Sequence, residues 1–183
     1  MHSDETIGIN RKPRRGTRFS SQNFMNNSNN KKIRLGEYDF HFICDIEPDQ
    51  NSDGTVETVM PQSRYKNAGS LSLNRYGNGP FCRFRIPNKT KTAGVYAIIV
   101  AEQVKYIGEC KKLSARYNAG YGNISPRNCF VGGQQTNCRI NNLVLNEFVK
   151  LRSSITLWFF ETDDYKRIEA ELLQQFRPLW NRR

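Results

Sequence analysis

The sequence predicts an α/β (α+β) fold: a small mixed or antiparallel sheet of three strands flanked by helices, with a β-rich N-terminal extension. Two observations predict this class. Short β-branched apolar runs occupy residues 95–100, 104–107 and 155–160, at lengths typical of buried strands. Apolar residues at helical spacing recur between and after these runs. With 183 residues, the chain suits one compact unit with additions.

Residues 1–35 are expected to form a basic, disordered arm. Asn, Ser and Arg dominate this segment and apolar residues are few, so it cannot bury enough apolar surface to fold alone. Its positive charge suits contact with phosphates. A solubilising or cloning-derived tail explains the same composition equally well.

Residues 36–91 are interpreted as a β-rich N-terminal extension. Residues 40–46, 55–59 and 81–86 each predict a strand. In the first, alternation places four apolar side chains on one face: Phe40, Phe42, Cys44 and Ile46.

The strand expected at residues 81–86 has a basic face. Cys82, Phe84 and Ile86 alternate with Arg83 and Arg85, so the two arginines project together from the other face. These arginines suit contact with a DNA backbone, although an ordinary solvated face explains them as well.

Residues 92–183 form the third part of the chain, with the predicted order β-β-α-α-β-α. The expected elements are a hairpin of residues 95–100 and 104–107, a helix from Lys112, a Gly- and Asn-rich loop over 118–137, a helix over 140–151, a strand over 155–160, and a last helix that ends before Pro178.

The last helix carries one acidic residue on its apolar side. At 100° per residue, Glu169 falls within the arc of five apolar residues: Tyr165, Ile168, Leu172, Leu173 and Phe176. Glu171 falls on the opposite face. A carboxylate among buried side chains needs a cation or an ion-pair partner, so we expect Glu169 to bind a metal ion or to pair with Arg116.

The charge of the chain favours a polyanionic partner. The formal net charge is +11, and basic side chains that neutralise phosphates gain affinity by releasing counterions. No run of about 18 apolar residues occurs, and the start lacks the apolar core of a signal peptide. We therefore expect a cytoplasmic protein with no membrane partner.

Five cysteines are present, an odd number with no CxxC pair. This pattern argues against a disulfide framework and a zinc ribbon and favours reduced thiols. A zinc site assembled from His41, Cys44 and two distant cysteines is the weaker alternative.

Several spaced motifs in residues 92–183 resemble the GIY-YIG nuclease family. Gly94-Val95-Tyr96 is followed by Tyr106-Ile107-Gly108, and Arg116 follows at the family's spacing. Glu169 and Asn181 stand twelve residues apart, and the ending Phe-Arg-Pro-Leu-Trp-Asn is similar to the family's closing signature. Each trio alone is weak, whereas the ordered combination is specific.

The resemblance implies a metal-dependent DNA endonuclease whose catalytic domain is residues 92–183. It implies that Glu169 holds one divalent ion per site, Mg²⁺ or alternatively Mn²⁺, and that Arg116 binds the scissile phosphate. Tyr96 would accept the proton of the attacking water if its pKa is lowered, and Tyr106 would orient that water or the phosphate. Asn181 is expected near the same centre.

Three positions depart from the family pattern. Val95 replaces an isoleucine, and Glu109 stands where many members have lysine, so residue 109 is not expected to contact phosphate. Members often carry His or Tyr four residues after the arginine. That place is Gly120, and the role is assigned to Tyr121.

Target recognition is expected from the loop before the second helix. A helix start attracts phosphate, and Gln, Asn and Arg suit base edges. The expected nucleic-acid contacts here are Arg127, Gln134, Gln135, Asn137, Arg139 and Asn141.

The sequence thus predicts an enzyme that cuts double-stranded DNA, of the stand-alone restriction or phage type. Cutting both strands requires a homodimer, a higher oligomer or sequential nicking. The alternative is a non-catalytic nucleic-acid-binding protein that retains the fold.

Overall fold

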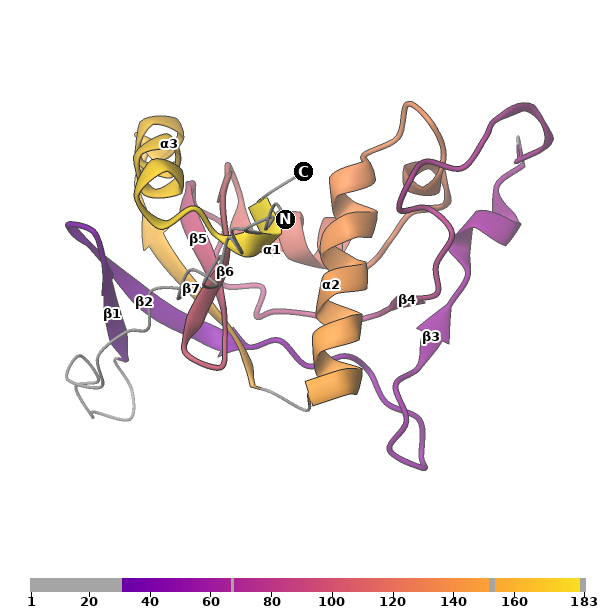
Figure 1. Ribbon diagram of the computed structural model, residues 1–183, viewed down its shortest axis with the longest axis horizontal. Coiled ribbons are helices and arrows are strands. Elements are labelled where there is room, and N and C mark those ends of the chain that lie inside the picture. The colour runs from indigo at the N-terminus through magenta and orange to yellow at the C-terminus, as the bar shows by residue number, and fades with distance from the viewer. Residues whose placement is uncertain (1–30, 67, 152–153, 182–183) are drawn as a thin grey trace, which may run out of the picture.

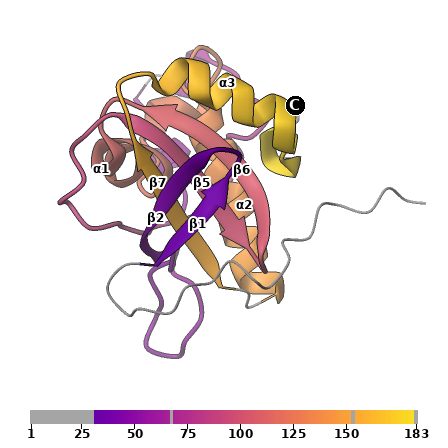
Figure 2. The ribbon, with the colours of Figure 1, turned by 90° about the vertical axis from the view of Figure 1, so that its left-hand side faces the viewer.

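The computed structural model describes residues 31–66, 68–151 and 154–181, without the side chain of Leu151. Most of the expected basic arm, residues 1–30, lies outside the described residues. The described chain forms three layers, with α3 (Tyr165–Phe176) on one face of a five-stranded sheet and α1 (Leu113–Arg116) and α2 (Gln135–Leu151) on the other (Figures 1 and 2). The α/β class expected from the sequence is confirmed.

The sheet is antiparallel throughout, with strand order β1-β2-β7-β5-β6. The three expected strands are β5 (Gly94–Val100), β6 (Gln103–Cys110) and β7 (Ile155–Glu161). Two more, β1 (Lys32–Leu35) and β2 (Tyr38–Asp45), come from the N-terminal part of the chain. They extend the sheet because β2 satisfies the backbone hydrogen-bonding groups of β7 that face away from β5.

A bulge divides the apolar residues of β2 between two cores. The register shifts between Phe42 and Cys44, which turns the following side chains to the other face of the sheet. Phe40 and Phe42 therefore pack on the α3 side, whereas Cys44 and Ile46 pack on the α2 side. The expectation that all four share one face is wrong, because strict alternation holds only in an unbulged strand.

The apolar arc of α3 packs as predicted. Ile168 and Leu172 are buried against β5 and β6 in the α3-side core, with Tyr165, Leu173 and Phe176 partly buried beside them. The helix ends at Phe176, and Arg177 adopts the left-handed conformation before Pro178.

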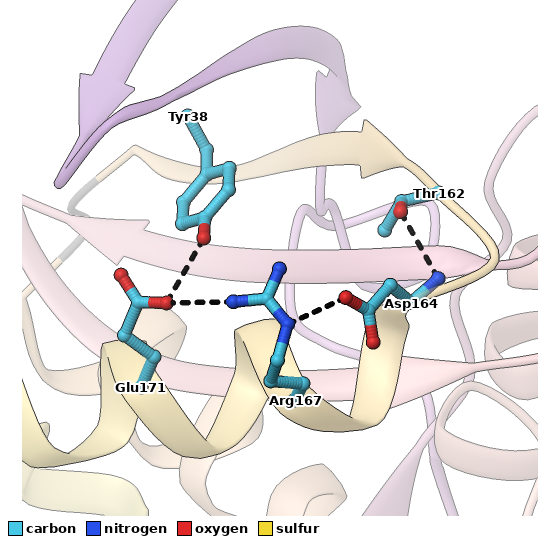
Figure 3. A network of polar contacts seen from close by, with 5 residues as sticks. All are labelled: Tyr38, Thr162, Asp164, Arg167 and Glu171. Atoms are coloured by element: carbon cyan, nitrogen blue, oxygen red, sulfur yellow. Dashed lines mark hydrogen bonds and ion pairs between the residues drawn. The ribbon is translucent and has the colours of Figure 1, made fainter.

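The opposite face of α3 carries an exposed polar network (Figure 3). Tyr38 donates a hydrogen bond of 2.9 Å to Glu171, and Arg167 pairs with Glu171 and with Asp164. The Asp164 backbone N–H donates to Thr162. Glu171 is thus an ordinary surface carboxylate, in contrast to Glu169.

The part of the N-terminal extension that follows β2 packs on the far side of α2 (Figure 1). Its strands β3 (Thr58–Val59) and β4 (Phe81–Cys82) are shorter than expected and form a separate two-stranded sheet. The alternation predicted for residues 81–86 is confirmed, with Arg83 and Arg85 exposed and the apolar side chains buried. Short 3₁₀ turns complete the described fold: Pro61–Arg64, Ala68–Ser70, Pro126–Cys129 and Leu179–Asn181.

No helix in the described ranges has the length and apolar character needed to cross a bilayer.

Candidate active site

A pocket of about 350 Å³ opens where β6, α1, α3 and the start of α2 meet. It brings together five of the six residues predicted to be catalytic: Tyr96, Tyr106, Arg116, Tyr121 and Glu169. Gln134, Gln135 and Asn137, predicted to contact nucleic acid, line the same pocket. We call this depression the tyrosine pocket.

Paired strands place two of the tyrosines. In the β5–β6 register, Tyr96 lies opposite Gly108 and Ile98 lies opposite Tyr106. Because side chains two residues apart share a face of a strand, Tyr96 and Tyr106 project from the same face, with ring centroids 6.0 Å apart.

A hydrogen-bonded chain of hydroxyls joins three tyrosines. The hydroxyl oxygens of Tyr96 and Tyr121 are 2.7 Å apart, and those of Tyr106 and Tyr121 are 3.5 Å apart. Burial raises the pKa of Tyr96 well above 10, and the neighbouring tyrosines add to that effect. Burial also raises the pKa of Tyr121. The side chains around Tyr96 therefore raise its pKa, whereas the role as a proton acceptor requires a lowered pKa. The hydroxyls of Tyr96 and Tyr121 are both neutral at pH 7.

A π-helical turn, Tyr117–Tyr121, positions Tyr121. The Gly122 N–H donates a 2.8 Å hydrogen bond to the Tyr117 carbonyl, five residues earlier. Such a turn contains one residue more than an α-helical turn, so the fifth residue after Arg116 lies one turn beyond it. The Arg116 guanidinium carbon lies 5.9 Å from the centre of the Tyr121 ring.

Arg116 remains a cation in this setting. Burial by itself lowers the pKa of Arg116, but Tyr96, Tyr121 and Glu109 raise it by more, so the net direction is upward. A charged guanidinium beside neutral hydroxyls provides strong donors for the oxygens of an anion.

Glu169 is a half-buried carboxylate with incomplete charge compensation. Burial and the nearby Glu109 carboxylate raise its pKa, whereas the Glu109 backbone N–H and Arg116 lower it by less. The ion pair with Arg116 considered from the sequence is not formed in the described part of the chain. Glu169 therefore retains the capacity to bind a cation.

The donor set fits a hard divalent cation. Among the described residues, no cluster of three or more His, Cys, Asp or Glu side chains is arranged to hold a metal. Mg²⁺, however, is commonly bound by one or two carboxylates, with water and substrate phosphates completing its shell. Glu169, with Glu109 beside it, supplies such a set. All five cysteines are free thiols, and they form no such cluster within the described ranges.

Asn181 contacts β6 and does not line the tyrosine pocket. The Ile107 N–H donates to its Oδ1 at 2.9 Å, and its Nδ2 donates to the Ile107 carbonyl at 2.7 Å. Asn181 thus continues the hydrogen bonding of the sheet beyond its edge strand. In the structure Asn181 thus positions β6, and its side chain does not join the other predicted catalytic residues in the pocket.

Two residues predicted to contact nucleic acid make hydrogen bonds inside the protein. The fully buried Asn141 amide bonds the backbone of Cys82 and the Tyr121 carbonyl, so its hydrogen-bonding groups are engaged inside the protein. Arg139 is half-buried and donates to the Trp180 carbonyl, which ties α2 to the C-terminal turn. Burial removes the Asn141 side chain from the surface, which the loop sequence does not reveal, whereas Arg139 remains partly exposed.

The remaining predicted nucleic-acid contacts differ in position. Gln134 and Gln135 are exposed at the pocket rim, and Asn137 is buried with its Nδ2 bonded to Gln134. Arg127 braces its own loop by donating to the Val131 carbonyl at 2.8 Å.

Arg83 and Arg85 lie outside the lining of the tyrosine pocket. Arg83 is 3.8 Å from the Glu57 carboxylate, and both side chains are about half exposed. Arg85 is exposed. Both arginines remain available at the surface.

Sequence reasoning missed two features of this region. Glu109, set aside as a departure from a motif, lines the pocket beside Glu169. Tyr117 is fully buried, and its ring packs edge-on against Tyr96 and Tyr121 at centroid distances of 5.4 and 5.3 Å. The alternation of β6 was the available signal for Glu109, because it places Ile107 and Glu109 on the α3 face.

Comparison of the chain with protein-family models, curated proteins and solved structures finds no match. The functional interpretation therefore depends on the residues of the tyrosine pocket.

Proposed function

We propose that this protein is a metal-dependent endonuclease of the GIY-YIG type that hydrolyses phosphodiester bonds of double-stranded DNA. One observation carries the proposal. One pocket of about 350 Å³ is lined by two tyrosines, an arginine and a glutamate, namely Tyr96, Tyr106, Arg116 and Glu169. These residues lie up to 73 positions apart in the sequence. A module that only binds nucleic acid has no need for a carboxylate beside the phosphates.

The π-helical turn supports the resemblance at a position where the sequence departs from it. The family often has a His or Tyr four residues after the arginine, and here Tyr121 is the fifth. Because the turn contains one additional residue, Tyr121 still lies against Arg116 and Tyr96.

Glu169 would hold the divalent cation, with Glu109 close enough to contribute through water. Bound there, such a cation would supply Lewis-acid stabilisation of the charge that develops on the leaving oxygen. Mg²⁺ is proposed and Mn²⁺ is the alternative. The raised pKa of Glu169 is consistent with this role, since a cation replaces the proton that burial favours.

The other side chains act on the phosphate and the water. Arg116 would bind the phosphate oxygens through its planar fork, more strongly as negative charge accumulates. Tyr96 is a neutral hydroxyl, hydrogen-bonded to Tyr121, and would orient the attacking water. It would accept the proton of that water only after losing its own proton to solvent, a loss that a bound cation and Arg116 would favour. Tyr106, 3.5 Å from the Tyr121 hydroxyl, would complete the orientation of the water.

The partner proposed is double-stranded DNA, supported by the net charge of +11. A restriction or phage-type enzyme acting in the cytoplasm fits this chemistry. One pocket per chain implies that both strands are cut by a homodimer or higher oligomer, or by successive nicks.

The test is cleavage of supercoiled plasmid and phage DNA in Mg²⁺ or EDTA by the unmodified protein, Glu169→Ala and Glu171→Ala. We expect cleavage only with Mg²⁺, its loss in Glu169→Ala, and its retention in Glu171→Ala, which alters the exposed face of the same helix. Cleavage by Glu169→Ala at the unmodified rate would refute the metal role of Glu169. DNA binding without cleavage on any substrate would favour the non-catalytic alternative.

A further inference from the structure

A second pocket, of about 620 Å³, adjoins the tyrosine pocket. Both pockets are lined by Glu109, Arg116, Gln134 and Asn137, so the two pockets form one continuous depression. We call this second depression the lysine pocket, after three residues of its lining: Lys111, Lys112 and Lys166.

The two pockets differ in charge. The tyrosine pocket has two carboxylates, Glu109 and Glu169, and one cation, Arg116. The lysine pocket has four cations and one carboxylate among its lining residues. A cation is therefore favoured in the tyrosine pocket and an anion in the lysine pocket, and Arg116 lines both.

The three lysines have no internal role that accounts for their charge. Lys111 and Lys112 follow the last residue of β6, and Lys166 lies in the first turn of α3. All three are exposed, and none takes part in an ion pair with another described residue. Two separate elements thus direct uncompensated positive charge to one pocket.

We propose that the lysine pocket binds the phosphodiester next to the scissile one, on the same DNA strand. The inference rests on the proposed function, which places the scissile phosphate at Arg116. A strand carries one negative charge per about 3.4 Å of helix axis, so a phosphate at Arg116 has its neighbour close by. The flanking phosphate fixes the register of the strand across the tyrosine pocket.

The test is the salt dependence of duplex binding. The full chain, in EDTA to prevent cleavage, is titrated with a fluorescently labelled DNA duplex at several KCl concentrations. Each phosphate contact contributes about 0.9 to the slope of log K against log [salt]. Because the lysine pocket holds one phosphate, we expect Lys111→Ala/Lys112→Ala and Lys166→Ala each to reduce the magnitude of this slope by up to about 0.9.

A matched control removes two exposed cations elsewhere. Lys32→Ala/Arg34→Ala alters β1, the strand at the opposite edge of the sheet from β6, and we expect it to leave the slope unchanged. The proposed site would be overturned if both double variants reduced the slope equally, or if the lysine-pocket variants left the slope unchanged.

Two further arms separate this site from the proposed function and from free anions. If the protein cleaves the same duplex in Mg²⁺ but the lysine variants leave the salt slope unchanged, the lysine pocket is overturned and the endonuclease function stands. Lysine-dependent binding without cleavage supports the site and refutes the endonuclease. Absence of binding overturns both. Lysine-dependent binding of inorganic phosphate, followed by phosphorus NMR, without an effect on the duplex slope identifies a free-anion site and overturns the proposal.

Discussion

Gly108 lies directly against Tyr96, so that a β carbon at Gly108 would come within 2.5 Å of the Tyr96 hydroxyl oxygen. The same carbon would lie 2.9 Å from the Tyr106 ring. The two residues face each other across the β5–β6 pair, and the missing side chain makes room for both rings. The geometry of the tyrosine pocket therefore depends on a glycine in the neighbouring strand.

Gly108→Ala is expected to displace the tyrosines. The added methyl group meets a packed ring, and overpacking of this kind costs about 1–3 kcal/mol. A displacement of about 1 Å is enough to lower cleavage by about 100-fold. Chemical denaturation and plasmid cleavage measure the two effects.

Gly69→Ala is the matched control for this substitution. A β carbon at Gly69 would meet no atom within 4 Å, so we expect a change in stability within about 0.5 kcal/mol. Normal cleavage by Gly108→Ala would show that the tyrosine positions are not required.

Asn181→Ala should loosen the free edge of β6. The variant loses both hydrogen bonds to Ile107 and leaves two backbone groups unpaired, at a cost of about 1–3 kcal/mol. Amide hydrogen exchange at Ile107 should accelerate, while Asn146→Ala, which alters an exposed residue of α2, should leave it unchanged. Unaltered exchange at Ile107 in Asn181→Ala would contradict the positioning role.

Glu169→Gln should stabilise the protein in a pH-dependent way. The pKa of Glu169 is raised in the folded state above its usual 4.5, so the unfolded chain loses this proton at lower pH than the folded one. The stability contributed by the group is present below pH 4.5 and is lost as the pH rises through the folded-state pKa. We therefore expect Glu169→Gln to unfold at higher temperature than the unmodified protein at pH 7, with no difference near pH 3.

The control for the pH effect is Glu171→Gln, which weakens an exposed ion pair with Arg167. This variant should be slightly less stable at pH 7. A Glu169→Gln variant that is less stable at pH 7 would indicate a structural ion pair and would argue against a cation-binding carboxylate.

Tyr117→Phe should preserve or raise stability. The Tyr117 hydroxyl is buried and has no hydrogen-bond partner among the described residues, so its removal relieves a desolvation cost of about 1–3 kcal/mol. The free energy of unfolding measures this effect.

Tyr96→Phe removes the 2.7 Å bond to Tyr121 and, under the proposed mechanism, lowers cleavage by about 10²–10⁴-fold. An equal loss of cleavage in Tyr96→Phe and Tyr117→Phe would contradict the specific role proposed for the Tyr96 hydroxyl.

The cysteine thiols should react slowly in the native protein. Burial raises the pKa of Cys44, Cys82, Cys110 and Cys138 to about 12 and raises that of Cys129. The nucleophilic thiolate is therefore scarce at pH 8. Titration with a chromogenic disulfide should detect five thiols only after unfolding. Fast reaction of two or more thiols in the native state would contradict this burial.

Local periodicity in the sequence was sufficient to predict much of the fold. The order of β5, β6, α1, α2, β7 and α3 matches the predicted order. Alternation also predicted correctly that Cys82, Phe84 and Ile86 are buried and that Arg83 and Arg85 are exposed. The position of Glu169 within the apolar arc of α3 was readable in the same way. These features depend on the neighbours of a residue along one helix or strand, which the sequence contains directly.

Only the tertiary structure decided features that join distant segments or break local regularity. The pairing of β2 with β7, the bulge after Phe42 and the Asn181–Ile107 bonds, 74 residues apart, depend on which backbone groups remain to be satisfied after folding. The π-helical turn adds one residue that no periodicity reveals, and burial converted Asn141 from an expected surface contact into an internal bridge. The sequence by itself determined which side chains were available for a site, and long-range packing decided which of them meet.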